Sequence, residues 1–258
     1  ENFRRLTGIK RTTFEKTIGI LKEKEVEKNR LGARPNKISL EERLLMWLEY
    51  MREYTTYFHT ATKHKISEST CFRNCVWIEN ILIKSKEFKL PNKKEYVNNL
   101  DIEVVVVDAS ESPIQRPKKK QRKYYSGKKK RHTLKSQIII NKADLKILKT
   151  NFCNGKKHDF RLLKESRPWI PKTVKMLGDT GYVGLHKIHQ NSEISKKKKK
   201  LIPLTKDEKK GNHELSSRRV CVENVLCVLK RFKVISERYR NRRKRFGLRF
   251  NLIAGIYN

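Results

Sequence analysis

The sequence predicts an α/β domain, a mixed sheet flanked by helices, preceded by a small all-α domain. Apolar side chains recur at helical spacing through about the first hundred residues. From Ile102 the pattern changes to short β-branched runs, and helical spacing returns toward the C-terminus. Runs of strands followed by helices are typical of such a mixed architecture. We therefore expect two domains, spanning residues 1–95 and 96–258.

The predicted all-α domain begins with a helix that has Phe14, Ile18 and Leu21 on one face. Ser39 and Glu42 form a capping box ahead of a second helix. The apolar stripe of that helix comprises Leu40, Leu44, Trp47, Leu48 and Met51. Pro35 lies in the connection between the two helices, and residues 91–94 form a polar linker to the second domain.

Residues 61–82 resemble a helix-turn-helix. Ser67 is expected to cap a helix whose apolar stripe is Cys71, Cys75, Ile78 and Leu82. The opposite face presents Ser69, Arg73 and Trp77, and in a DNA reader that face enters the major groove. Lys65 stands where glycine is usual in the turn, so a plain three-helix packing unit remains a serious alternative.

The predicted α/β domain has five candidate strands, at residues 102–107, 134–140, 145–152, 173–177 and 201–204. A short helix is expected to begin within residues 158–164, and a long one spans residues 217–236. A basic turn at residues 238–245 precedes a last helix with Phe246, Phe250, Ile253 and Tyr257 at helical spacing.

The charge of the chain predicts a polyanionic partner. Lys and Arg number 63 against 27 Asp and Glu, which gives a formal net charge of +36. Nucleic acid is the usual partner of a protein with so high a positive charge. Ribosomal proteins, histone-like proteins and proteins of anionic membranes share this property, so charge alone names no reaction.

No apolar run reaches the roughly 20 residues of a membrane span, and no secretion signal is evident, so we expect a cytoplasmic protein without a membrane partner. The chain begins with Glu1 rather than Met, which suggests that a few upstream residues are absent. The odd count of five cysteines favours reduced thiols. His59, His64, Cys71 and Cys75 invite a zinc interpretation, but the apolar stripe explains the two cysteines better.

Two aspartates are expected at strand ends. Asp108 follows the strand-like residues 104–107, and Asp179 follows residues 174–177 through Gly178. Carboxylates at strand ends stand at the rim of a sheet, where α/β proteins place their sites. Either aspartate alone would be interpreted as a turn or helix-cap residue.

Glu223 favours the interpretation of the two aspartates as metal ligands. It lies in the most apolar part of a long helix, where an unpaired carboxylate is costly. Its alternative partners are Arg219 one turn earlier and Lys230 two turns later. Phosphodiester cleavage uses two Mg²⁺ or Mn²⁺ ions roughly 3.5–4 Å apart, and such hard ions prefer carboxylate oxygen. Asp108, Asp179 and Glu223 are therefore the candidate metal ligands and catalytic residues.

The segment after Asp108 has no acidic residue from Ser112 to Ala143. It is suited to holding phosphates, and Tyr124 or Tyr125 could stack on an unpaired base. The alternatives are that the charges form an ordinary solvated surface and that the tyrosines belong to the core. The candidate DNA-binding residues here are Arg116, Lys118, Lys119, Lys120, Arg122, Lys123, Tyr125, Lys128, Lys129, Lys130 and Arg131.

Taken together, the chain resembles DDE-type transposases of bacterial insertion sequences, in particular insertion-sequence family five and the related Harbinger-type elements. The resemblance covers nearly the whole chain and is carried by residues 107–111, 115–129, 158–159, 178–182, 222–223 and 229–232. It implies an RNase H-like catalytic domain behind a helix-turn-helix. By motif match, Asp108 and Asp179 are the two aspartates of the triad and Glu223 is its glutamate.

The resemblance further implies binding to terminal inverted repeats, metal-dependent cleavage at element ends and joining to target DNA. The expected partner is double-stranded DNA, bound by a homo-oligomer associated with the bacterial nucleoid. His158, Asp159, Arg219 and Lys230 are possible auxiliary residues. The competing hypotheses are an inactive or domesticated DNA-binding derivative acting as a repressor, and a plain RNase H-like nuclease or resolvase.

Overall fold

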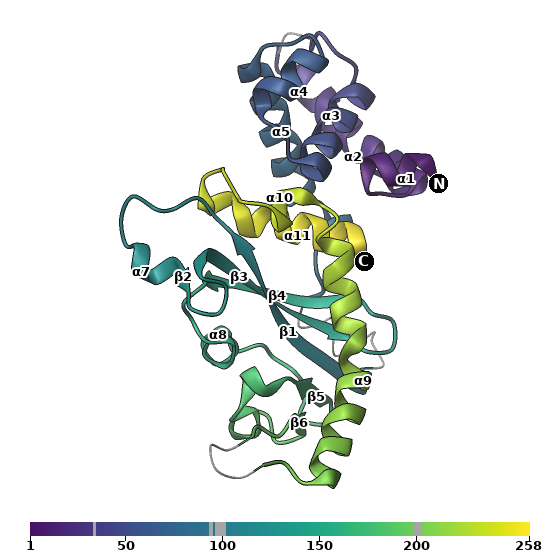
Figure 1. Ribbon diagram of the computed structural model, residues 1–258. Helices are drawn as coiled ribbons and strands as arrows, with labels where there is room; N and C mark the ends of the chain where they lie inside the picture. The colour runs from purple at the N-terminus through teal and green to yellow at the C-terminus, as the bar shows by residue number, and fades with distance from the viewer. Residues whose placement is uncertain (33–34, 93–94, 96–101, 199–202) are drawn as a thin grey trace. The chain divides into compact units, whose positions relative to one another are not determined.

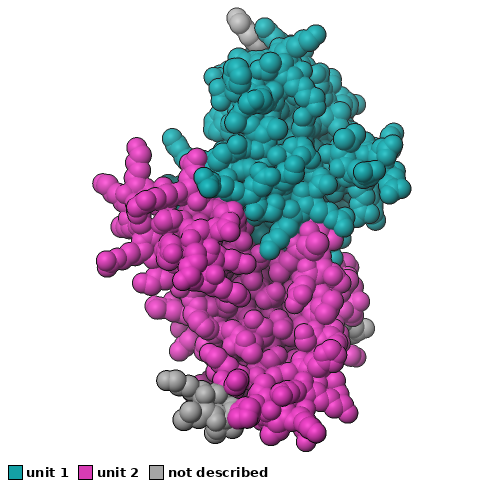
Figure 2. All heavy atoms as spheres, viewed as in Figure 1, with its two compact units in different colours: residues 1–89, 229–258 teal, residues 90–228 magenta. Residues whose placement is uncertain are grey.

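The computed structural model describes the whole chain except residues 33–34, 93–94, 96–101 and 199–202 (Figure 1). The backbone forms two units, coloured in Figure 2. The first unit comprises Glu1–Lys89 and Leu229–Asn258, and the second comprises Leu90–Val228. The expected boundary near residue 95 thus divides the chain differently from the structure, because residues 229–258 pack with the N-terminal helices.

The first unit is helical. Its N-terminal part contains α1 (Asn2–Thr7), α2 (Arg11–Arg30), α3 (Leu40–Glu53), α4 (Tyr57–Lys63), α5 (Glu68–Leu82) and η1 (Lys86–Phe88). The side chain of Ser39 caps α3 by accepting a hydrogen bond from the Glu42 N–H at 3.1 Å, as its sequence predicts. On α2 only Thr17 and Leu21 are buried. Phe14 and Ile18, which were expected on the same apolar face, are only partly buried.

The C-terminal part of this unit contains α10 (Lys233–Ser236), η4 (Arg243–Arg245) and α11 (Phe246–Tyr257). A buried ion pair ties α11 to α5, where Arg249 Nε lies 2.7 Å from Glu79 Oε1 and both side chains are excluded from solvent. Arg245 contacts the other carboxylate oxygen of Glu79 at 2.7 Å. Breaking a buried pair leaves an uncompensated charge, which typically costs about 3–5 kcal/mol. This interaction explains why the C-terminal segment joins the first unit.

The second unit contains a mixed six-stranded sheet, as the sequence predicts. Its strands are β1 (Val104–Pro113), β2 (Tyr125–Ser126), β3 (Arg131–Asn141), β4 (Ile147–Asn154), β5 (Lys175–Gly178) and β6 (Ser192–Ile194). β3 pairs antiparallel with β1, β2 and β4, whereas β5 pairs parallel with β1 and with β6. The sequence analysis missed the short strands β2 and β6.

Asp108 does not end its strand, which corrects the sequence interpretation. β1 continues to Pro113, and Asp108 stands opposite Ile138 of β3. The parallel pairing with β5 ends earlier, at Val106 opposite Leu177. Asp108 therefore lies inside β1, two residues beyond the point where β1 loses its parallel neighbour.

Helices connect and cover these strands. They are α7 (Gln121–Tyr124), α8 (Asp159–Ser166), η2 (Thr180–Tyr182), η3 (Leu185–Lys187) and α9 (Lys206–Leu229). The core between the sheet and α8 includes Val105, Val107, Ile139, Leu163 and Tyr182. The expected helix over residues 217–236 is interrupted after Leu229 and resumes as α10. Of the strand expected at 201–204, residues 201–202 lie outside the described residues and residues 203–204 are not in a strand.

Cys71 and Cys75 are fully buried, together with Ile78 and Leu82, so the interpretation of this stripe as core is confirmed. Within the described ranges, no helix combines the length and apolarity needed to cross a bilayer.

Candidate active site

Asp108 is a largely buried carboxylate on the central strand β1, with 20% of its side chain exposed. Burial is the main cause that raises its pKa from 3.8 to about 6. The Ala109 backbone and the Arg219 guanidinium lower this pKa, whereas the charges of Asp179 and Glu223 raise it further. The three acids predicted from sequence therefore interact electrostatically within one unit.

Asp179 follows β5 and caps the short helix η2. Its Oδ1 accepts a hydrogen bond from the Gly181 N–H at 2.9 Å. Asp179 is thus a helix-cap residue, which was the alternative interpretation of its sequence, and capping does not exclude a role as a metal ligand. A carboxylate has about four lone-pair sites, so the cap fixes the orientation of Asp179 while leaving Oδ2 able to accept.

Arg219 and Glu223 are four residues, about one turn, apart on α9. Arg219 is buried, and its Nη2 lies 4.0 Å from Asp108 Oδ1. Glu223 is exposed, although Val222, Val225 and Leu226 around it are buried. The interpretation of Glu223 as a costly buried charge was therefore wrong, because this residue stands on the solvent side of an amphipathic turn. Glu223 nevertheless lies close enough to Asp108 for its charge to raise the pKa of Asp108.

Asp159 is the first residue of α8 and lies beside Asp179. A Cβ atom on Gly181 would come 2.9 Å from Asp179 Oδ1 and 3.1 Å from Asp159 Oδ2. Only glycine fits between these two carboxylates without displacing one of them. The other oxygen of Asp159 lies 2.8 Å from Nζ of the buried Lys135. Asp108, Asp159, Asp179 and Glu223 make up the acidic cluster. Of the other auxiliary residues, Arg219 lies beside Asp108, whereas Lys230 belongs to the first unit, and His158 is an exposed residue that precedes α8.

Sequence reasoning assigned no role to two buried polar side chains beneath these acids, Gln137 and Tyr182. Gln137 Nε2 donates to the Tyr182 hydroxyl oxygen at 3.0 Å and to the Asp159 carbonyl at 3.2 Å. Burial, followed by the charges of Asp108 and Asp159, holds the pKa of Tyr182 well above its ordinary value, so the phenol stays neutral. The available signal was the polar run Lys135, Ser136 and Gln137 inside an otherwise apolar strand.

The carboxylates do not form a closed cage. In the described parts of the chain, no three His, Cys, Asp or Glu side chains converge tightly enough to hold a metal ion by themselves. Mg²⁺ does not require such a cage, because it usually binds through one or two carboxylates together with waters and substrate phosphates. An open set of hard oxygen donors, completed by water and by a substrate phosphate, would fit this preference.

The helix-turn-helix expected from sequence is formed by α4, a turn and α5. Ser67 accepts a hydrogen bond from the Thr70 N–H at 3.2 Å and caps α5. Lys65 adopts φ +51°, the left-handed conformation that the turn demands, so lysine replaces glycine here at a modest cost. Ser69 and Arg73 are exposed on α5. Trp77 is only partly exposed, with the Arg43 guanidinium 4.2 Å from the centre of its ring.

The basic segment between β1 and β3 lies on the surface. All of its predicted phosphate-binding cations are exposed, namely Arg116, Lys118, Lys119, Lys120, Arg122, Lys123, Lys128, Lys129, Lys130 and Arg131. None of them forms an ion pair with another described residue. Tyr125 is 43% exposed, whereas Tyr124 is half-buried. The charges of this segment are therefore available to an anionic ligand.

Comparison with known proteins gives matches to both parts of the chain. Residues 99–258 match the family model described as a transposase DDE domain, and residues 36–87 match the helix-turn-helix of DDE superfamily endonucleases. Over 257 residues the chain is 45% identical to a protein of Microchaete diplosiphon named as the probable transposase for insertion sequence element IS702. That alignment covers 99% of this chain and 93% of the relative.

The raised pKa of Asp108 predicts a pH-dependent cost to stability. A carboxyl whose folded pKa is about 6 and whose unfolded pKa is 3.8 favours the fold when protonated. This contribution is present below about pH 4 and is lost as the pH rises through about 6. Asp108→Asn, which is neutral at every pH, should therefore gain up to about 3 kcal/mol over wild type between pH 4 and pH 7.

The measurement is denaturant unfolding of both proteins from pH 4 to pH 7 with EDTA present. Asp207→Asn, which changes an exposed aspartate of α9, serves as the control. A difference between Asp108→Asn and wild type that stays constant over this range would contradict the expected burial cost.

Proposed function

The chain belongs to the DDE transposase family, a family of metal-dependent endonucleases, and on this premise we propose that it binds the terminal inverted repeats of an insertion sequence and cuts and joins DNA there. The observation that carries the catalytic part is the electrostatic coupling of Asp108 to Asp179 and Glu223. These side chains come from β1, the end of β5 and α9, and their mutual repulsion is relieved by a cation.

Asp108, Asp179 and Glu223 would hold two divalent ions, Mg²⁺ or Mn²⁺. When bound, such ions supply an activated attacking oxygen and a counter-charge for the leaving oxygen. Asp108 is suited to the role because burial and its acidic neighbours disfavour its bare charge. Asp179 is suited because the Gly181 N–H fixes its orientation.

The remaining residues of the cluster orient these acids. Arg219 lies 4.0 Å from Asp108 and offsets part of the negative charge. Lys135 holds Asp159 beside Asp179, and its Nζ also donates to the Lys157 carbonyl at 2.6 Å. Gln137 joins Tyr182 to the first turn of α8. The carboxylates are therefore held in position before DNA binds. This lowers the entropic cost of reaching the reactive geometry.

DNA recognition is assigned to two surfaces. The exposed face of α5, with Ser69 and Arg73, is proposed to read base edges in the major groove. Trp77 is proposed to support this face rather than to enter the groove, since Arg43 covers its ring. The basic segment 116–131 is proposed to bind phosphates, and cutting two element ends calls for a homo-oligomer on the DNA.

We expect Asp108→Asn, Asp179→Asn and Glu223→Gln each to reduce cleavage of duplexes carrying the element's own ends to background. Each change removes a metal-binding charge at nearly constant shape, so DNA affinity should stay within about twofold of wild type. Cleavage and binding are measured on the same duplexes.

Glu214→Gln, which changes an exposed glutamate of the same helix α9, is the matched control and should cut normally. Normal cleavage by Glu223→Gln would show that the triad is misassigned. Binding without cleavage by the unmodified chain would favour the repressor hypothesis, and cleavage without preference for the ends would favour a plain nuclease.

Arg73→Ala should lower affinity for the element's end by about 1–3 kcal/mol and affinity for scrambled duplex much less, because a bidentate contact to guanine is lost. Lys22→Ala, an exposed lysine on α2, is the control for loss of one charge. Circular dichroism reports whether the helices are intact. Equal losses on both duplexes by a folded Arg73→Ala protein would make Arg73 a phosphate contact.

Neutralising several cations between Lys118 and Arg131 should weaken binding to every sequence alike. Each lost phosphate contact should reduce the slope of log affinity against log salt by about one unit. The slope is obtained by titrating cognate and scrambled duplexes at several salt concentrations. If it did not change, the segment would be a solvated surface without a role in binding.

A further inference from the structure

The first unit contains a run of cations to which the proposed function assigns no role. Residues 238–245, predicted from sequence as a basic turn, include six Arg and Lys side chains, and no acidic residue occurs from Arg238 to Asn258. We call this segment the C-terminal basic loop. It belongs to the same unit as the helix-turn-helix, although the whole second unit separates the two in the sequence. The exposed cations of the loop are Arg238, Arg240, Arg242, Arg243 and Lys244.

Hydrogen bonds and an aromatic contact fix the first half of this loop to the C-terminal end of α3. Tyr239 is buried and stacks on Tyr54, with the ring centroids 6.2 Å apart. The Arg240 N–H donates to the Tyr54 hydroxyl oxygen at 2.7 Å. Asn241 Nδ2 donates to the hydroxyl oxygens of Tyr50 and Tyr54 at 2.7 and 2.9 Å. Three consecutive residues of the loop are therefore held in place.

The end of the loop contacts α5. Arg245 Nη2 donates to Asn80 Oδ1 at 3.1 Å, and its Nε donates to Glu79 Oε2 at 2.7 Å. Asn80 is exposed and follows Arg73 by two turns, so the two lie on the same face of the helix. That face is the one proposed to read base edges. The loop thus ends on the reading face, about 10 Å along α5 from Arg73.

The exposed cations between these two anchors repel one another in the free protein. Arg242, Arg243 and Lys244 are consecutive, and the anchors on both sides keep them together. Neither Arg242 nor Lys244 forms an ion pair with another described residue. Like charges held close together favour a polyanionic ligand, which relieves their repulsion and releases its own counterions.

A DNA duplex with α5 in its major groove would place such a polyanion beside the loop. The major groove is about 12 Å wide. α5 has 15 residues and is about 22 Å long, which exceeds the width of the groove. If the N-terminal part of α5 reads bases, its C-terminal end lies near the sugar-phosphate backbone. Phosphate contacts at that end would fix the register of α5 without reading sequence.

We propose that the C-terminal basic loop binds the phosphates that flank the base pairs read by α5, so that the C-terminal segment completes the DNA-reading unit. The proposal rests on the proposed function, because it takes the duplex bound by α5 as the ligand. Arg242 and Lys244 contact the phosphates. Arg240 and Arg245 hold the loop in place, because Tyr54 and α5 already engage their guanidinium groups.

The first test measures the salt dependence of duplex binding by the full chain in EDTA, so that cleavage plays no part. Arg242→Gln with Lys244→Gln should reduce the slope of log affinity against log salt by about two units on cognate and scrambled duplexes alike. Arg242→Lys with Lys244→Arg keeps both charges and should bind like wild type. Arg4→Gln with Lys22→Gln, which changes exposed cations of α1 and α2, is the matched control and should leave the slope unchanged.

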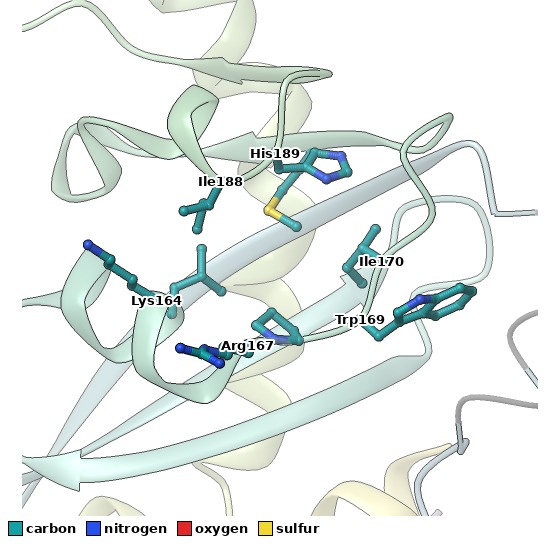
Figure 3. A pocket seen from close by; sticks show the side chains of 9 residues that line it. Lys164, Arg167, Trp169, Ile170, Ile188 and His189 are labelled. Carbon is teal, nitrogen blue, oxygen red and sulfur yellow. The ribbon is translucent and has the colours of Figure 1, made fainter.

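The second test locates the contact by replacing single phosphates of the element's end with neutral methylphosphonates. At some positions the replacement should weaken binding to wild type but not to Arg242→Gln with Lys244→Gln. These positions should lie within one turn, about 10 base pairs, of the position to which Arg73→Ala makes the protein insensitive. Lys164→Gln with Arg167→Gln should leave this pattern intact. These two cations belong to the second unit and lie beside a cavity of about 390 Å³ (Figure 3).

A change of slope no larger than that of the matched control would overturn the proposal, as would loop-dependent phosphates more than one turn from the Arg73 position. The scrambled duplex keeps the two proposals separable. A chain without preference for the element's ends would refute the proposed function, whereas the loop would still be supported by the loss of about two units of slope.

Discussion

The unequal pairing of β1 on its two sides determines where the acidic side chains meet. β3 accompanies β1 to Pro113, whereas the parallel pairing with β5 ends at Val106. Beyond that point one side of β1 has no described strand beside it, and Asp108 follows two residues later. Asp179 follows β5 where that strand turns away through Gly178. The pairing with β3 fixes the backbone of Asp108, and the hydrogen bond from the Gly181 N–H fixes the side chain of Asp179.

The position of Asp108 disfavours its negative charge, and the nearby Arg219 offsets only part of this electrostatic cost. Asp108 is buried near two other acids, and its pKa rises to about 6 despite Arg219. Asp159 is paired with Lys135, so the cost is concentrated on Asp108. A carboxyl whose pKa is strongly shifted by burial and by neighbouring charges is typical of functional sites. This cost is the reason for proposing that a cation binds at these acids.

The sequence predicted those features that depend on local patterns. The caps at Ser39 and Ser67, the buried stripe from Cys71 to Leu82 and the mixed sheet follow from periodicity and side-chain chemistry, and the structure confirms them. The family resemblance, carried by motifs around the acids, was confirmed by the comparisons. The assignment of individual site residues remains a prediction.

Features that depend on distant pairings could not be derived. The ion pair of Glu79 with Arg249 joins residues 170 positions apart, and nothing in either helix alone indicates it. The continuation of β1 past Asp108 depends on β3, and the exposure of Glu223 depends on which side of α9 meets the sheet. Tyr182 looks like an ordinary turn residue until its hydrogen bond with Gln137 is seen.

Direct measurement of Mn²⁺ binding tests most sharply whether these acids form a metal site. Electron paramagnetic resonance of free Mn²⁺, titrated with the full chain and uncleavable DNA, counts the bound ions. Wild type and Glu214→Gln should bind Mn²⁺ equally, whereas Asp108→Asn, Asp179→Asn and Glu223→Gln should each lose binding. Undiminished Mn²⁺ binding by all three folded variants would contradict a metal site at these acids.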